Sequence, residues 1–202
     1  AAPIGARTFL FGFIYLLITR IASRFGTEVQ NGLGVGIRLE GLCFFILLGF
    51  GFAASPIVGQ NLGAKRPDRA SRGAWTTFGF ALVPALFFTA LFLFASESLM
   101  ALIASDAGSA RHGAEYLRIV AICMSFTAME VIFAHSFVGA GDTMPVTLID
   151  IPITASRVPI AWFLTTRLDL GPAAVWWTIA GTALARGLLM MLWFLRGNWK
   201  RA

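Results

Sequence analysis

Apolar and polar residues occupy separate blocks along this chain. Runs of predominantly apolar residues recur, each about as long as the roughly 20 residues that a helix needs to cross 30 Å of hydrocarbon. Short polar and charged stretches separate them. The pattern predicts an all-α membrane protein with six transmembrane helices that form one bundle. The spans are expected near residues 3–25, 29–59, 74–95, 117–138, 146–166 and 173–195.

Basic residues gather at the ends of these runs and predict the orientation. The second run stops at Gly59-Gln60-Asn61-Leu62-Gly63 and is followed at once by a strongly basic stretch. Lys and Arg are retained on the cytoplasmic side. We therefore expect a multi-pass protein of the inner (cytoplasmic) membrane with both chain ends in the cytoplasm. Seven basic residues then lie on the cytoplasmic side (Lys65, Arg66, Arg69, Arg72, Arg196, Lys200 and Arg201) and four on the other (Arg20, Arg24, Arg111 and Arg167).

The composition excludes two other classes of protein. Apolar residues make up 57% of the chain and charged residues only 13%, with a mean hydropathy of +0.77. A soluble domain needs about a quarter of charged residues to build its surface. The net charge of +6 raises the question of nucleic-acid binding, but the basic residues sit at the ends of apolar runs and form no continuous face. We expect no nucleic-acid partner.

Glu130 is the most informative ionisable residue, because it lies near the middle of the fourth span. A carboxyl group is costly there, by about 2.5–3.5 kcal/mol on insertion scales. It can act as a proton carrier, or it can bind a sodium ion together with oxygen atoms such as that of Thr127, one turn earlier. It can also form a structural ion pair with an arginine of a neighbouring helix. The sequence leaves these three interpretations open.

Other polar residues within the spans are candidates for substrate binding or gating. Asp150 and Arg157 are seven residues apart in the fifth span, so they share one helix face and could bracket a wet groove. His135 lies about 140° around the helix from Glu130 and is not expected to form a dyad with it. Arg38 and Glu40 must find partners elsewhere.

No arrangement of residues supports catalysis or a metal site. The chain has no Gly-Lys-Ser/Thr phosphate loop and no credible Ser/His/Asp or paired-carboxylate site. Cys43 and Cys123 lie in apolar runs without a second ligand at metal-binding spacing. We therefore expect no enzyme activity, no metal and no tightly bound cofactor. Energy for any transport must come from an ion gradient or another subunit.

Four motifs, in order, resemble the carboxyl-terminal half of the multidrug and toxic compound extrusion (MATE) family. They are Arg38-Leu39-Glu40, then Val58-Gly59-Gln60-Asn61-Leu62-Gly63-Ala64 with the basic stretch after it, Gly139-Ala140-Gly141-Asp142-Thr143, and Arg157-Val158-Pro159. The resemblance covers essentially the whole chain.

The resemblance implies a transporter of twelve helices in two lobes of six, of which residues 1–202 would be the carboxyl-terminal lobe. It implies export of cationic or amphipathic compounds in exchange for H⁺ or Na⁺ as the lobes rock. The expected partners are these small molecules, membrane lipids and an amino-terminal six-helix lobe. That lobe would come from the same polypeptide, of which this chain is a fragment, or from a second copy of the chain.

Two positions depart from the family pattern. Many members carry an acidic residue shortly after the proline of helix seven, where this chain has Arg7, and an aspartate in helix ten, where it has Thr127. Glu130 resembles the acidic residue of a subset of the family and is the replacement expected from the resemblance. Two alternative functions stay open: a flippase for lipid-linked substrates with similar architecture, and a membrane assembly subunit that transports nothing.

Overall fold

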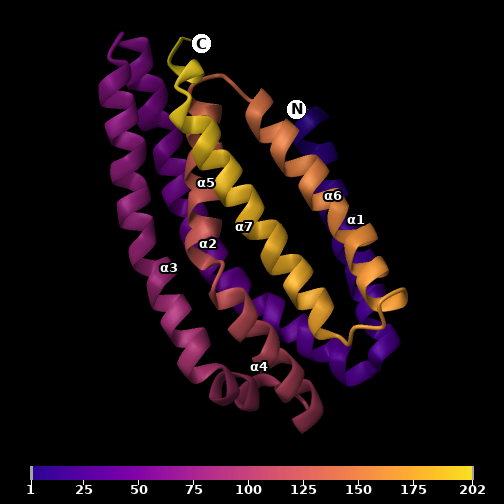
Figure 1. Ribbon diagram of the computed structural model, residues 1–202. Coiled ribbons are helices and arrows are strands. Elements are labelled where there is room, and N and C mark those ends of the chain that lie inside the picture. The colour runs from indigo at the N-terminus through magenta and orange to yellow at the C-terminus, as the bar shows by residue number, and fades with distance from the viewer. Residues whose placement is uncertain (1, 202) are drawn as a thin grey trace. The chain divides into compact units, whose positions relative to one another are not determined.

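The computed structural model describes the backbone of residues 2–201 and the side chains of residues 11–200. Every regular element in this range is helical, which confirms the all-α prediction (Figure 1). The side chain of Arg7 lies outside the described residues. The elements are α1 (Ala2–Ala22), η1 (Ser23–Phe25), α2 (Thr27–Gly63), α3 (Pro67–Ile103), α4 (Ala107–Ala121), α5 (Met124–Gly139), α6 (Met144–Thr166), α7 (Ala173–Leu195) and η2 (Asn198–Arg201).

Four of the described helices, α2, α3, α6 and α7, are long and apolar enough to cross a membrane. A fifth span results if α4 and α5 are counted together as one broken span. The remaining expected span, residues 3–25, coincides with α1, whose side chains are described only from residue 11. The chain is therefore a multi-pass membrane protein.

Helices α2 and α3 are longer than the spans expected near 29–59 and 74–95, with 37 residues each. About 20 residues suffice to cross the hydrocarbon, so both helices must tilt or extend beyond it. The turn between them is short. Lys65 adopts a left-handed backbone with φ 58°, and the amide of Arg66 donates to the carbonyl of Asn61 at 2.9 Å. Pro67 then opens α3, at a position where a missing amide costs nothing.

The fourth expected span, residues 117–138, is not one continuous helix. Helix α4 ends at Ala121 and α5 begins at Met124, so the helix is broken at Ile122 and Cys123. The carbonyl of Cys123 accepts the amide of Thr127 at 2.9 Å, which starts the hydrogen bonding of α5. No proline or glycine lies at the break. Local sequence therefore carries no signal for it.

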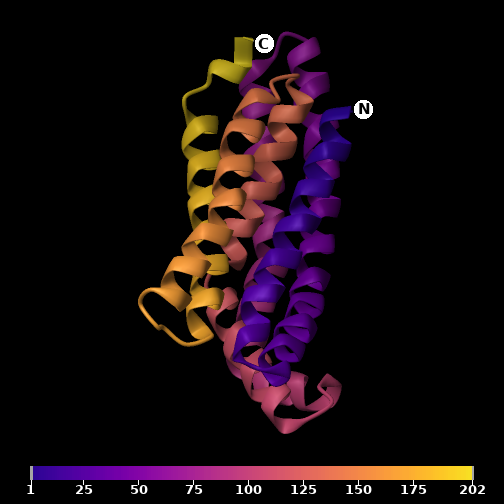
Figure 2. The same cartoon turned by 90° about the vertical axis from the view of Figure 1, so that its right-hand side faces the viewer.

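The chain divides into two compact units, and each is considered by itself. Unit 1 contains residues 1–40, 90–122 and 151–182, and unit 2 contains residues 41–89, 123–150 and 183–202. In unit 1, α1 and the first part of α2 run antiparallel, joined by the turn at Ser23–Gly26 (Figure 2). The core of unit 1 includes the fully buried side chains of Ile18, Leu33 and Trp176.

The core of unit 2 is built largely from aromatic rings. The ring of Phe194 lies 4.7 Å from that of Phe133 and is stacked at 4.5 Å on that of Trp199, and Trp75 meets Phe133 edge-on at 5.0 Å. Offset and edge-on arrangements at these distances are favourable for aromatic pairs. The indole N–H of Trp199 donates to the carbonyl of Phe194 at 2.9 Å.

The tryptophans near the ends of the helices differ in their exposure. Tryptophans at span ends are usually anchors in the lipid headgroup layer. Trp176 and Trp199 are instead buried in their units, at 0% and 1% exposure. Trp177, at 55% exposure, keeps the position expected of an interfacial anchor.

Candidate functional site

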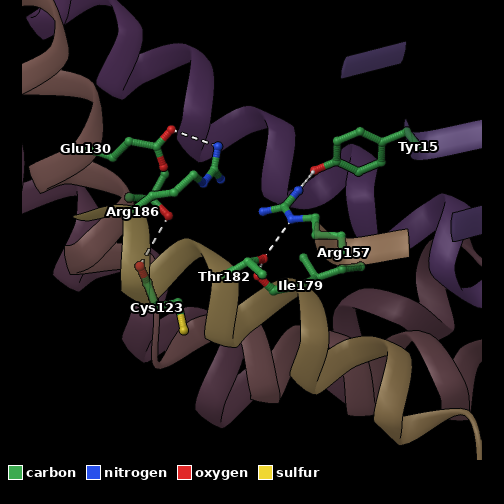
Figure 3. Close-up of polar contacts among 8 residues, drawn as sticks. Tyr15, Cys123, Glu130, Arg157, Ile179, Thr182 and Arg186 are labelled. Carbon is green, nitrogen blue, oxygen red and sulfur yellow. Dashed lines mark hydrogen bonds and ion pairs between the residues drawn. The ribbon is translucent and has the colours of Figure 1, made fainter. Parts of the chain in front are cut away.

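Glu130 forms an ion pair within unit 2. Its Oε1 lies 2.9 Å from Nη1 of Arg186, and the side chains are 9% and 8% exposed (Figure 3). Glu130 comes from α5 and Arg186 from α7. Of the three interpretations left open by the sequence, the structure shows the ion pair with an arginine of a neighbouring helix. Sequence analysis did not identify Arg186 as the partner.

A glycine beside Arg186 allows α5 and α7 to approach closely. A Cβ atom at Gly187 would overlap the backbone carbonyl oxygen of Phe126, one turn before Glu130. Small residues at helix contacts are the usual way in which membrane helices come close together. The close approach brings the two charged groups within hydrogen-bonding distance.

A buried ion pair of this kind responds strongly to the loss of either charge. Its two charges compensate each other in a medium where an isolated charge is very costly. Protonation of the carboxylate would remove one of the two charges of this pair, and a cation at the carboxylate would compete with the guanidinium for the same oxygen atoms. The ion pair therefore joins α5 to α7 through two opposite charges.

Thr127, the second residue expected at an ion-coupling site, is buried on α5. Its hydroxyl donates to the carbonyl of Cys123 at 3.2 Å, across the first turn of α5. A hydroxyl oxygen that donates in this way keeps lone pairs for a cation. The contact that the structure shows for Thr127 is nevertheless local to its own helix.

Asp150 and Arg157 both lie on α6 but belong to different units. Asp150 is in unit 2 and is 0% exposed, and Arg157 is in unit 1 and is 2% exposed. The wet groove expected between them stays a prediction.

Arg157 is held by hydroxyl groups of unit 1. Its Nε donates to Oγ1 of Thr182 on α7 at 2.7 Å, and its Nη1 lies 3.4 Å from the hydroxyl of Tyr15 on α1 (Figure 3). The Thr182 hydroxyl in turn donates to the carbonyl of Thr178 or Ile179, at 2.8 and 2.9 Å. We call Arg157, Tyr15 and Thr182 the Arg157 cluster.

A second polar contact of unit 1 joins α2 to α4. The hydroxyl of Tyr116, which is fully buried, donates to Oε2 of Glu40. The ring of Tyr116 lies against Gly36, where a Cβ atom would overlap it, and meets Trp176 edge-on at 5.5 Å. Sequence analysis named Glu40 but missed both tyrosines. The chain has only 2 tyrosines, and each forms a polar contact of unit 1: Tyr116 with Glu40, and Tyr15 with Arg157. This rarity is the signal in the sequence that could have identified them.

His135 has a local role in unit 2. Its Nδ1 lies 2.8 Å from the carbonyl of Val131 on the same helix, and its ring meets Phe52 edge-on at 5.4 Å. These contacts are those of a packed, hydrogen-bonded side chain. Among the described residues, no group of three or more His, Cys, Asp or Glu side chains could hold a metal ion.

Known proteins include several relatives of this chain. The chain is 25% identical over 204 residues to a probable multidrug resistance protein NorM of Thermotoga maritima, covering 98% of this chain and 43% of that protein. It is 25% identical to a protein of the same name from Pseudomonas aeruginosa, covering 99% and 42%. The chain thus spans about two fifths of the length of the curated relatives it matches.

Solved structures share the fold. An inward-facing multidrug resistance MATE transporter superposes with a TM-score of 0.80 at 17% identity, over 89% of this chain and 41% of that one. A transporter of the MOP superfamily from Pyrococcus furiosus superposes with a TM-score of 0.82 at 16% identity, over 95% and 42%. The MatE family model matches residues 3–163 of the chain. The chain therefore belongs to the multidrug and toxic compound extrusion family, as the resemblance of its motifs implied.

Proposed function

We propose that this chain is the carboxyl-terminal lobe of an exporter of cationic or amphipathic compounds. The exporter would be driven by H⁺ or Na⁺ across the cytoplasmic membrane, with Glu130 as the ion-coupling residue. An amino-terminal lobe, from the same polypeptide or from a second copy, completes the transporter. Both chain ends then lie in the cytoplasm. The relatives named as multidrug resistance proteins support the substrate class.

The observation that carries the proposal is the buried pair of Glu130 and Arg186, at 2.9 Å. In the resting state the two groups neutralise each other. When a proton or a cation occupies the carboxylate, the pair loses one of its two interacting charges, and the contact between α5 and α7 is weakened. Ion binding at one residue thus changes the stability of a helix contact, which is what coupling between an ion gradient and a conformational change requires.

The test separates coupling from simple structural support. The complete transporter, with its amino-terminal lobe, is expressed in a drug-sensitive strain as wild type, as Glu130→Gln, as Arg186→Gln and as the double variant. Each single variant removes one charge of this buried pair and should reduce the amount of protein in the membrane. The double variant contains a neutral pair and should recover the amount of protein, but not ethidium efflux.

Glu97→Gln with Arg118→Gln is the matched control, because this ion pair of 2.6 Å is exposed in unit 1. Exposed ion pairs contribute about 0–1 kcal/mol to stability. This control should therefore leave the amount of protein in the membrane and the rate of ethidium efflux unchanged. Ethidium efflux at the wild-type rate in the neutral double variant would reject Glu130 as the coupling residue. Efflux in everted vesicles without sodium, driven by a pH gradient alone, distinguishes H⁺ from Na⁺.

A second candidate function has one observation in its favour. The Arg157 cluster places a guanidinium in the interior of unit 1. A guanidinium forms strong hydrogen bonds with phosphate oxygens, which would suit a lipid-linked phosphate carried by a flippase. For the Pyrococcus furiosus transporter, the reverse polarity of its binding pocket suggests a different function. Loss of a lipid-linked sugar in a deletion strain, with normal drug tolerance, would favour flipping over efflux.

A further inference from the structure

Unit 1 contains a pocket of about 350 Å³ between the end of α1, η1 and the second half of α6. Its apolar lining comes from Leu17, Ile21, Val158 and Pro159. The ring of Trp162, 41% exposed, forms another wall. The pocket is thus largely apolar and opens on the exposed side of unit 1.

Two arginines complete the lining, Arg20 and Arg24, and both are exposed. They are one helical turn apart, a spacing at which like charges repel. Nη1 of Arg24 reaches Oγ1 of Thr166 at 3.4 Å, toward the end of α6. A third guanidinium, of Arg167, lies 6.0 Å from the ring of Trp162. The described residues that line the pocket include no carboxylate.

The position of these arginines conflicts with the expected orientation of the chain. Basic residues concentrate on the cytoplasmic side of membrane proteins. Of the four basic residues expected on the opposite side, Arg20 and Arg24 line this pocket, and the guanidinium of Arg167 lies 6.0 Å from the ring of Trp162 in its wall. Topogenesis therefore does not explain them, and a ligand of opposite charge would.

We propose that the pocket binds an anionic phospholipid of the leaflet in which α1 and α6 end. The headgroup phosphate would accept hydrogen bonds from Arg20 and Arg24, since the planar guanidinium suits phosphate oxygens. The start of an acyl chain would lie along the apolar lining. Trp162 belongs to the residue type that prefers the interface between hydrocarbon and headgroups. A negative charge would also offset the repulsion between the two arginines.

The size of the pocket agrees with this assignment. A volume of about 350 Å³ is at the lower end of the range for small-molecule sites, about 300–1,000 Å³. It holds a phosphate headgroup and the first methylene groups of a chain, while the remainder of the lipid stays in the bilayer. This binding site is independent of the coupling role proposed for Glu130.

The complete transporter, purified in mild detergent with equal amounts of phosphatidylglycerol and phosphatidylcholine, is the material for the test. Native mass spectrometry then counts retained lipids. Wild type should retain phosphatidylglycerol in preference to phosphatidylcholine, and Arg20→Gln with Arg24→Gln should lower that retention about tenfold. Because both side chains are exposed, the double variant should unfold at the wild-type temperature.

Arg111→Gln is the matched control, because Arg111 is an exposed arginine of unit 1 that lines a different pocket beside Glu97 and Glu115. It should retain phosphatidylglycerol as wild type does. The proposal is overturned if the double variant retains as much phosphatidylglycerol as the control. It is also overturned if wild type shows no preference between the two lipids, or binds neither, as would follow if the amino-terminal lobe covers the pocket.

Discussion

The two units hold their buried arginines in different ways. In unit 2, Arg186 faces a carboxylate at 2.9 Å. In unit 1, Arg157 donates to the hydroxyl groups of Thr182 and Tyr15 at 2.7 and 3.4 Å. An ion pair in the interior depends on both full charges, so one proton can change it completely. Hydroxyl groups can rotate and can both donate and accept, so their hydrogen bonds rearrange at low cost.

The side chains around the two arginines also differ between the units. The core of unit 2 is a set of aromatic rings in contact, with Phe133 and Phe194 on the same helices as Glu130 and Arg186. Rings locked by their neighbours fix the distance between helices. In unit 1, the hydroxyl groups of the buried residues Tyr116 and Thr182 take part in hydrogen bonds between helices. The described contacts of the two arginines thus differ: a carboxylate faces Arg186 in unit 2, and hydroxyl groups contact Arg157 in unit 1.

The largest loss of stability is expected when one member of the ion pair between Glu130 and Arg186 is replaced. Arg186→Gln removes the guanidinium that faces the buried carboxylate of Glu130, at a cost of about 3–5 kcal/mol. In unit 1, Thr182→Val removes one hydrogen bond to a guanidinium, at a cost of about 1.5–3 kcal/mol. Thermal unfolding of the purified transporter measures both. Equal shifts in melting temperature would contradict the difference drawn between the units.

The next largest effect on stability is expected from a substitution that forces α5 and α7 apart. Gly187→Ala places a methyl group against the Phe126 carbonyl and should cost about 1–3 kcal/mol through overpacking. The matched control lies on the same helix: Gly181→Ala meets nothing within 4 Å and should stabilise α7 by about 0.5–1 kcal/mol. Opposite signs in the thermal shift are the expected result. A stable Gly187→Ala protein would show that the close approach is not needed.

A loss of stability of similar size is expected from one of the two tyrosines of unit 1, and a smaller loss from the other. Tyr116→Phe removes the hydroxyl that donates to Glu40, a hydrogen bond to a charged group worth about 1.5–3 kcal/mol. Tyr15→Phe removes only a contact of 3.4 Å to Arg157 and should cost less than about 1 kcal/mol. Urea or thermal unfolding ranks the two. The reverse order would mean that the Arg157 cluster depends on Tyr15 more than the distance indicates.

The smallest effect is a pH dependence at the start of α4. The carboxylate of Asp106 accepts the amide of Ser109 at 2.8 Å and its hydroxyl at 2.7 Å, and these hydrogen bonds hold the pKa of Asp106 below its usual value of 3.8. A lowered pKa in the folded state means that the stabilisation is present above the unfolded pKa and is lost as pH falls through the folded pKa.

Asp106→Asn provides the reference for this prediction, because asparagine can cap a helix without titrating. The difference in melting temperature between wild type and variant should shrink as the pH falls below 3.8. A difference that stays constant down to the lowest accessible pH would show that the capping carboxylate contributes nothing in its charged form.

The sequence was sufficient where the information is local. The lengths of apolar runs predicted the all-α membrane fold, and the position of Glu130 within a run identified it as a residue that must be compensated. Information about which helices pack together is not local. The partner Arg186 is 56 residues away in the chain, and nothing in the pattern of α5 points to α7.

The features that the sequence did not predict also depend on how helices pack together. The break at Ile122 and Cys123 lacks the proline or glycine that marks most interruptions of a helix. Trp176 and Trp199 have the sequence position of interfacial anchors but are buried, because a neighbouring element covers each ring within its own unit. Periodicity along one helix cannot show such coverage.

The lack of a Cβ atom at Gly187 affects how the sequence of this family member could diverge. Because backbone meets backbone beside the ion pair, the strength of the pair can be altered by a change of one methyl group that touches neither charge. If Glu130 has the coupling role proposed above, selection could change the ion dependence while every acidic and basic residue stays in place. Comparisons restricted to charged positions would overlook that route.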